Sequence, residues 1–114
     1  MLRRFLGSKL KGMRITGVNL EYEGSITIDE RYTDAAGILP GEAVNVLNLE
    51  NGNRFTTYVI KGERGSGITE LNGPAARLGM KGDRIMVLTY VLLTPEEIKT
   101  FVPKVVSAAE IQGR

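Results

Sequence analysis

The segment Glu23-Gly24-Ser25 has the residue types for an attack by a serine hydroxyl on the peptide bond that precedes it. Gly24 leaves its carbonyl carbon sterically open and allows backbone angles that other residues avoid, which the Ser25 hydroxyl needs in order to reach that carbon. The attack converts the amide into an ester. Elimination from the ester releases a chain that ends at Gly24 and leaves a dehydroalanine, which water converts to ammonia and a pyruvoyl group at position 25. The segment therefore predicts a self-made ketone, an electrophile that no standard side chain supplies.

The same dipeptide is also common in loops, and this chain contains it at Gly7-Ser8, Gly24-Ser25 and Gly65-Ser66. Taken alone, Gly-Ser is more typical of an ordinary turn than of self-processing. Gly65-Ser66-Gly67 is interpreted as a loop without assigned chemistry. Sequence outside the dipeptide decides between the two interpretations of Gly24-Ser25.

Several separated motifs surround this segment in one order. They are Met1-Leu2-Arg3, Ser8-Lys9, Tyr22-Glu23-Gly24-Ser25, Asp34-Ala35-Ala36, Gly41-Glu42, Asn51-Gly52, Arg54, Thr57-Tyr58, Gly62-Glu63-Arg64-Gly65-Ser66-Gly67 and Asn72-Gly73. With these motifs the chain resembles, nearly from end to end, the pyruvoyl-dependent aspartate alpha-decarboxylases. These small enzymes convert L-aspartate to beta-alanine and CO2 for pantothenate and coenzyme A biosynthesis.

The resemblance implies a single catalytic domain over residues 1–114, a proenzyme cut between Gly24 and Ser25 into fragments 1–24 and 25–114. The cofactor would be the covalently bound pyruvoyl group derived from Ser25. It forms a Schiff base with the substrate amine and accepts the electrons released with CO2, so pyridoxal phosphate would be unnecessary. A lysine Schiff base is not excluded by composition. The resemblance also implies a homotetramer with active sites between neighbouring subunits, and it leaves open whether processing is unaided or needs a maturation factor.

Four side chains carry over from the family motifs. Thr57 would donate to the Gly24 carbonyl oxygen during processing and contact substrate. Arg54 would bind a substrate carboxylate through its planar two-donor fork, with Lys9 as the second cation. Tyr58 matches the proton donor of the family, and a phenol is a reasonable acid in a chain that has no histidine. Without the resemblance, Thr57 and Tyr58 read as strand residues and Arg54 as a solvated residue after a turn.

The segment Asn72-Gly73-Pro74-Ala75 would contribute backbone amides for the substrate carboxylate, as a short helix with Pro74 at its first position. A plain turn is the alternative. Tyr22 would form a wall of the site. The chain departs from the family pattern at Lys11, where many members have histidine, and at Pro74, where alanine is usual. Pro74 also removes one backbone amide from this segment.

Composition excludes much other chemistry. The 114 residues include neither cysteine nor histidine, which excludes disulfides, thiolate nucleophiles, zinc fingers and serine–histidine triads. The acidic residues follow no calcium or magnesium spacing, so no metal is expected. No apolar run approaches the ~20 residues of a membrane span, and no secretory signal opens the chain, so a soluble cytoplasmic protein without membrane contact is expected.

The net charge is +2 with a pI near 9.0, a mild excess of cations that suits anionic ligands. The one basic cluster consists of Arg3, Arg4, Lys9, Lys11 and Arg14. It lacks the interleaved aromatic residues of a nucleic-acid platform, so binding to nucleic acid is not expected.

Short apolar alternations separated by Gly, Asn and Pro predict a mainly β protein with a few short helices. Asn51-Gly52, between strands predicted at 43–49 and 54–60, is the strongest hairpin signal. In that second strand, alternation places Arg54 and Tyr58 on one face and Thr57 on the other. Further strands are expected at 13–18, 24–29 with Gly24-Ser25 on an exposed turn, 85–93, and 105–106 at an edge; residues 1–10 are expected to be structured.

Two short helices are expected. Asp29 caps the first, which carries Tyr32, Ala35, Ala36 and Leu39 at helical spacing and is stopped by Pro40-Gly41. The sequence Thr94-Pro95-Glu96-Glu97 begins the second, which Pro103 ends, and 109–114 is expected to be a fraying tail.

These patterns predict a small β-barrel or sandwich, and the resemblance implies a double-psi β-barrel. The rival to the enzyme is an uncleaved, non-catalytic barrel that binds an anionic ligand or nucleic acid.

Overall fold

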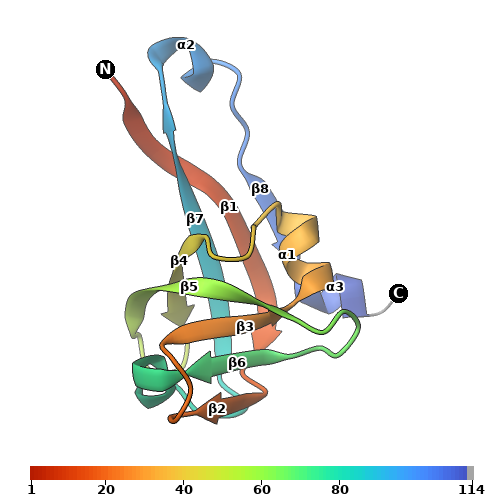
Figure 1. The fold of residues 1–114 in the computed structure, drawn as a ribbon. Helices are drawn as coiled ribbons and strands as arrows, with labels where there is room; N and C mark the ends of the chain where they lie inside the picture. Colours follow the sequence, from red (N-terminus) through yellow and green to blue (C-terminus); the bar gives the residue numbers. More distant parts are fainter. Residues whose placement is uncertain (113–114) are drawn as a thin grey trace.

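Eight strands form one curled sheet in the order β2-β6-β3-β5-β4-β7-β1-β8, seen in the computed structural model of residues 1–112 (Figure 1). The strands are β1(Arg3–Arg14), β2(Gly17–Asn19), β3(Ser25–Asp29), β4(Ala43–Asn48), β5(Arg54–Gly62), β6(Thr69–Asn72), β7(Arg84–Leu93) and β8(Lys104–Ser107). The helices are α1(Glu30–Ala36), η1(Gly73–Arg77, a 3-10 helix), α2(Pro95–Ile98) and α3(Ala108–Gln112). The structure confirms a mainly β protein, a small barrel with a few short helices.

The strand that begins at Ser25 lies in the middle of the barrel. β3 pairs in parallel with β5 and antiparallel with β6, and β6 pairs in parallel with β2. The core beneath these strands is built from buried aliphatic side chains and one tyrosine, among them Leu10, Ile26, Ile28, Tyr32, Val46, Leu71 and Val87. Because neighbouring strands hold β3 on both sides, its first residue has a defined position.

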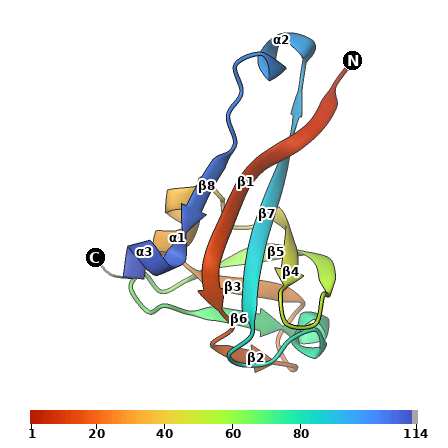
Figure 2. The ribbon, with the colours of Figure 1, turned by 180° about the vertical axis from the view of Figure 1, so that it is seen from behind.

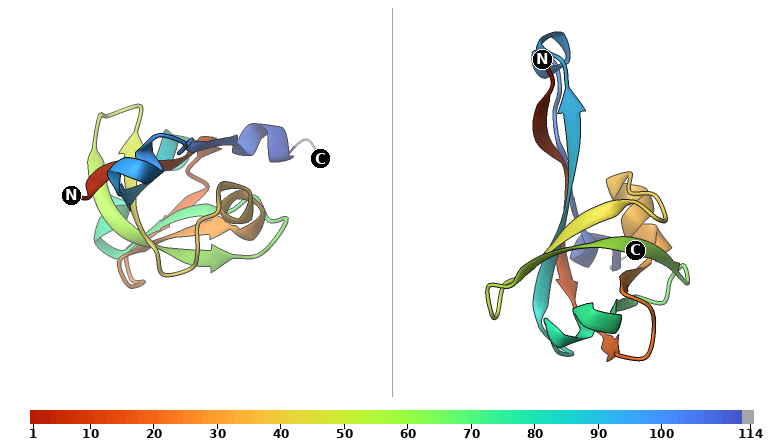
Figure 3. Two further views of the ribbon diagram at one scale, coloured as in Figure 1. Left: turned by 90° about the horizontal axis from the view of Figure 1, so that it is seen from above. Right: turned by 60° about the vertical axis from the view of Figure 1, so that its left-hand side comes forward.

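A long ribbon of two strands extends beyond the barrel. β1 and β7 pair antiparallel from Arg3 opposite Leu93 to Arg14 opposite Arg84, with α2 at the outer end (Figures 1 and 2). The side view shows this arm standing clear of the remaining strands (Figure 3). The arm and the segment after α2 expose apolar side chains, namely Met1, Leu2, Phe5, Leu92 and Val102.

The hairpin is confirmed, since β4 and β5 pair antiparallel across the Asn51-Gly52 turn. Both predicted helix starts are also confirmed: the Asp29 side chain caps α1, and Thr94 with Glu97 forms a capping box on α2. No helix within residues 1–112 has the length and apolar character needed to cross a bilayer.

Both helices end earlier than predicted. α1 ends at Ala36, and its C-cap Gly37 has a φ of 72°, the left-handed conformation that closes helices, so Leu39 lies outside the helix and is exposed. α2 ends at Ile98 rather than at Pro103.

The predicted strand at 13–18 is wrong, because the chain changes partners inside it. β1 ends at Arg14, and β2 starts at Gly17 beside β6. Thr16 lies between the two strands. Its Oγ1 donates to the Thr69 carbonyl (3.1 Å) and accepts from the Thr69 N–H (2.9 Å).

The predicted tail is in part wrong. Residues 108–112 form α3, in which Ala108 is fully buried and the Gln112 amide donates to the Tyr32 hydroxyl at 2.7 Å. The predicted edge strand at Val105-Val106 is confirmed as β8, parallel to β1. Residues 113 and 114, the rest of the predicted tail, lie outside the described residues.

Candidate active site

Ser25 is the first residue of β3, and it is fully buried rather than exposed on a turn. Its hydroxyl donates to the Glu23 carbonyl at 3.1 Å and accepts from Asn72 Nδ2 at 3.0 Å. The burial follows from the register, because Ser25 pairs with Asn72 of β6 as soon as the strand begins. The serine at the predicted cleavage point is thus held inside the fold by specific hydrogen bonds.

Asn72 is the polar centre of this region and is itself 1% exposed. Besides Ser25, its Nδ2 donates to Thr27 Oγ1 at 2.9 Å, which uses both amide hydrogens. Its Oδ1 is buried without a hydrogen-bond partner among residues 1–112. Leaving a buried acceptor without a partner costs about 1–3 kcal/mol of folding free energy. Asn72 Oδ1 is therefore available to accept a hydrogen bond close to Ser25.

Gly73 is the glycine whose conformation this region requires. Its φ is +61°, and a Cβ there would lie 2.7 Å from both Gly24 N and Tyr22 O. Gly24, by contrast, does not have a positive φ. The backbone conformation that other residues avoid, which the sequence led us to expect at Gly24, is found at Gly73. A Cβ on Gly24 would lie 3.3 Å from Pro74 Cδ, which leaves little room between Gly24 and η1.

A cleft of about 350 Å³ opens at Gly24. Its lining comes from the segment before β3, from β5 and from η1: Gly24, Phe55, Thr56, Thr57, Tyr58, Pro74, Ala75 and Leu78. Thr57 is half-buried, and Tyr58 is 38% exposed. The structure therefore brings Thr57 and Tyr58 to the same cleft as Gly24, although the two side chains alternate along β5.

Five predicted substrate-binding residues are not among those that line this cleft within the single chain: Asn72 and Gly73, which adjoin it, and Arg54, Lys9 and Tyr22. Arg54 begins β5 and lines a separate hollow of about 280 Å³ with Leu47 and Met86. Lys9 is half-buried in the middle of β1, opposite Leu88 of β7. Tyr22 is 49% exposed on the turn before β3. The two cations that would bind carboxylate are thus not among the residues that line the Gly24 cleft.

The far end of β3 is fixed by a buried carboxylate. Asp29 is fully buried, accepts from Arg31 Nη2 at 2.9 Å, and accepts from the Gly67 N–H at 2.7 Å. Burial acts to raise the pKa of Asp29, but hydrogen bonds from the Arg31 side chain and from backbone N–H groups of Gly67, Arg31 and Gly65 outweigh it and lower the pKa to about 2. The glycine loop at 65–67, expected to be without chemistry, therefore anchors the strand that Ser25 begins.

Sequence reasoning missed three residues of the lining, Phe55, Thr56 and Leu78. Phe55 and Thr56 adjoin the Thr57-Tyr58 motif, so their position next to it was the available signal; Leu78 carried none. No cluster of acidic side chains that could hold a metal ion occurs within the part of the chain that the structure describes.

Comparison with known proteins identifies the family of this chain. The sequence model of the aspartate decarboxylase family matches residues 1–112. The aspartate 1-decarboxylase of Caldicellulosiruptor saccharolyticus is 57% identical over 106 residues, which cover 93% of this chain and 83% of that protein. The aspartate 1-decarboxylase of Acaryochloris marina is 54% identical over 106 residues, with 93% and 81% covered, and that of Exiguobacterium sibiricum is 55% identical over 105 residues, with 92% and 83% covered. The resemblance noted in the motifs is confirmed, and the chain belongs to the aspartate decarboxylase family.

Proposed function

We propose that this protein is an aspartate 1-decarboxylase that converts L-aspartate to beta-alanine and CO2, with a pyruvoyl group made from Ser25 as its electrophile. The observation that carries the proposal is the environment of Ser25. This residue is fully buried, accepts a hydrogen bond from Asn72, and follows Gly24, at which the cleft opens. The names of the relatives support the substrate. The product suits the synthesis of pantothenate and coenzyme A.

Processing would begin with attack of Ser25 Oγ on the Gly24 carbonyl carbon. The C–N bond between the two residues breaks, and the nitrogen takes a proton as the ester forms. Loss of the Ser25 Cα proton then expels the Gly24 carboxylate on fragment 1–24, and the dehydroalanine takes up water and releases ammonia. A serine hydroxyl is a weak nucleophile, so positioning must supply much of the rate, and it can contribute up to ~10 kcal/mol.

Thr57 is the proposed donor to the Gly24 carbonyl oxygen as that carbon becomes tetrahedral. Its place on the wall of the cleft at Gly24 supports this role. Removing one donor of this kind typically costs about 3 kcal/mol of transition-state stabilisation.

The residues around Ser25 suit a ketone at this position. Elimination would remove Ser25 Oγ with the Gly24 carboxylate, which frees the Asn72 Nδ2 hydrogen that donates to it. This N–H could then donate to the ketone oxygen on Cα, which accepts hydrogen bonds and donates none. The free Oδ1 of Asn72 could accept from the substrate amine. When formed, the pyruvoyl group supplies an electrophilic carbonyl that takes up the substrate amine and withdraws the electrons released with CO2.

Tyr58 is the proposed proton donor to the substrate carbon. Its hydroxyl-bearing side chain lines the Gly24 cleft and is partly exposed, so it can reach a bound substrate. A phenol can protonate a carbanion, and the chain has no imidazole for the task.

The substrate carboxylates are assigned to Arg54, Lys9 and the Asn72–Ala75 segment, with Tyr22 as a wall. Because Arg54 and Lys9 do not line the cleft of their own chain, we place them in the cleft of a neighbouring copy in a homotetramer. The exposed apolar side chains of the β1–β7 arm support contacts between copies. The resemblance leaves open whether processing is unaided or needs a maturation factor, and slow cleavage of the purified protein would indicate such a factor here.

Intact-mass spectrometry and an assay for beta-alanine test the proposal. The protein should consist of fragments 1–24 and 25–114, the second with a pyruvoyl group and no free amino terminus. Ser25→Ala should stay one chain and form no beta-alanine. Ser66→Ala is the matched control, because Gly65-Ser66 repeats the dipeptide on an exposed turn, and it should behave as the parent. A parent chain that remains whole and inactive would favour the non-catalytic binding module.

A further inference from the structure

The turn between β4 and β5 is tied to η1 by three asparagines. The Nδ2 atoms of Asn48, Asn51 and Asn53 lie 3.3, 3.1 and 3.3 Å from the carbonyl oxygen of Leu78 and donate to it. A carbonyl oxygen has two lone pairs, so three donors on one such atom are more than it needs for satisfaction. This concentration of donors points to a role in holding Leu78 in place.

The turn that carries these side chains is itself held internally. Asn51 Oδ1 accepts from the Asn53 N–H at 2.9 Å, and Asn48 Oδ1 accepts from the Glu50 N–H at 2.8 Å. Asn48 is 2% exposed and also donates to Asp83 Oδ2 at 2.9 Å. The amides therefore reach Leu78 from a support that already has a fixed shape.

Leu78 is the C-cap of η1, and η1 is one wall of the Gly24 cleft. At the other end of this five-residue helix, Gly73 and Pro74 pack against Gly24. Because η1 is so short, a displacement of Leu78 would also move Gly73 and Pro74, which contact Gly24.

We propose that Asn51 and Asn53, with Asn48 behind them, are positioning residues that hold η1 against Gly24 and so set the rate of self-cleavage. This inference rests on the proposed function. None of the three lines the cleft, and they act through Leu78. Because a misplacement of about 1 Å can cost ~100-fold in rate, three weak hydrogen bonds at the end of the wall are enough to matter.

Two substitutions at Asn51 separate positioning from stability. Asn51→Asp keeps Oδ1, and with it the bond from Asn53 N, but it replaces the donor to Leu78 with a negative oxygen that repels that carbonyl. Asn51→Ala loses both bonds and introduces no repulsion. A positioning role thus predicts that Asp slows cleavage more than Ala, whereas a role in turn stability alone predicts that Ala is the more damaging change.

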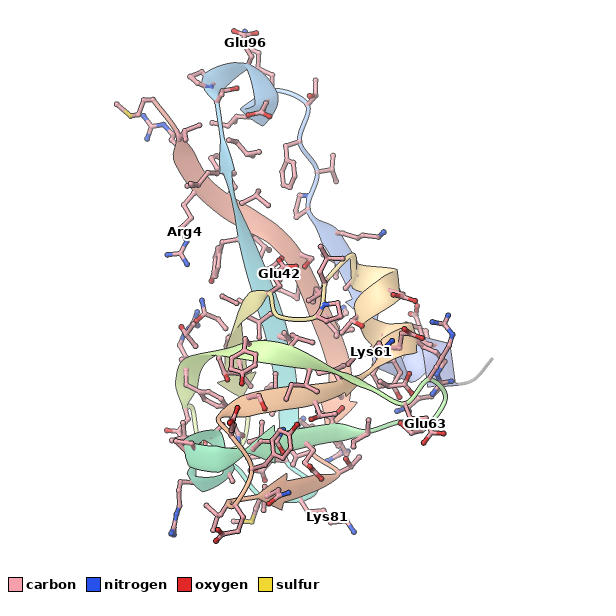
Figure 4. The ribbon with its side chains drawn as sticks, viewed as in Figure 1. Arg4, Glu42, Lys61, Glu63, Lys81 and Glu96 are labelled. Atoms are coloured by element: carbon pink, nitrogen blue, oxygen red, sulfur yellow. The ribbon has the colours of Figure 1, made fainter. Side chains whose placement is uncertain are left out.

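The cleavage rate is measured by intact mass on freshly purified chains, at a temperature where thermal melts show each variant fully folded. We expect Asn51→Asp to cleave about tenfold more slowly than the parent and Asn51→Ala about threefold, with the lower Tm in the Ala variant. Lys81→Gln is the control for the change of one charge, since Lys81 is exposed and points away from the body of the protein (Figure 4), and it should cleave at the parental rate.

Rates that follow the Tm values, or an Asp variant as fast as Lys81→Gln, would overturn the positioning role while leaving the proposed function standing. A parent chain that never cleaves would instead remove the proposed function and this inference together.

Discussion

Gly73 and Gly24 approach so closely that a Cβ on Gly73 would lie 2.7 Å from the nitrogen of Gly24 and 2.9 Å from its Cα. Both atoms belong to backbone, which has less freedom to move aside than the end of a flexible side chain. The contact places the first residue of η1 directly on the segment that the proposed reaction cuts.

Gly73→Ala should abolish or greatly slow self-cleavage, because the new methyl group must push Gly24 away from its position beside Ser25. The φ of +61° adds a conformational cost of about 1–2 kcal/mol. Gly37→Ala is the matched control, since Gly37, the C-cap of α1, has a φ of +72° and a Cβ there meets nothing within 4 Å. Intact mass and thermal melts should show a similar backbone penalty in both variants but impaired cleavage only in Gly73→Ala; equal cleavage would contradict the proposed contact.

Tyr58→Phe should cleave normally and bind aspartate, but turn over slowly and inactivate during use. Without the phenol, a proton can be delivered to the former Ser25 carbon. Water then releases the decarboxylated substrate as an aldehyde, and its amino group stays on an amino-terminal alanine at position 25, which leaves a dead enzyme. Mass spectrometry of fragment 25–114 after incubation with aspartate should show this alanine accumulating faster than in the parent. Tyr90→Phe, on β7 beside Arg4, serves as control. Full activity with an intact pyruvoyl group in Tyr58→Phe would assign the acid elsewhere.

Arg54→Lys should cleave normally, because Arg54 does not line the Gly24 cleft of its own chain. Its kcat/KM for aspartate should fall about tenfold or more, since lysine keeps the charge but loses the two-donor fork. Co-expression with Ser25→Ala should restore part of the activity, because a site between two copies can then combine an intact Ser25 with an intact Arg54. Near-parental kinetics of the single variant would remove Arg54 from the site.

Asp29→Asn, compared in an uncleaved Ser25→Ala background, should lower the free energy of unfolding most at neutral pH. Folding lowers the pKa of Asp29 from 3.8 to about 2, so the stability it contributes is fully present above about pH 4 and is lost as pH falls toward 2. Urea titrations at pH 6 and pH 3 should therefore show a larger difference between the two chains at pH 6. The same difference at both pH values would mean that the ionised carboxylate is not the stabilising group.

Local signals in the sequence predicted the elements whose partners are near in the chain. Asn51-Gly52 predicted the hairpin that pairs Leu47 with Arg54, and Asp29 predicted the start of α1 through its side-chain cap. The alternation in β5 is also confirmed by exposure, which is higher at Arg54 and Tyr58 than at Thr57.

The site itself depends on pairings that no local pattern contains. Ser25 is buried because it meets Asn72, which lies 47 residues further along the chain. The cleft exists because η1 comes to lie opposite β5, and this arrangement brings Thr57 and Tyr58 together with Gly24 while leaving Arg54 outside. Motif resemblance supplied the residue types, and long-range pairing decides which of them meet within one chain.

β1 and β2 pair with strands that lie on the other side of the proposed cut. Both strands belong to fragment 1–24, yet β1 lies between β7 and β8, and β2 lies beside β6, all in fragment 25–114. The cut would thus turn one polypeptide into an interlocked pair that needs no covalent link to persist. Once unfolded, however, the two pieces would have to find each other in solution, so recovery would depend on concentration, whereas an uncut chain refolds alone. Cleavage would therefore give a protein whose fold, once lost, is recovered only when its two fragments associate again.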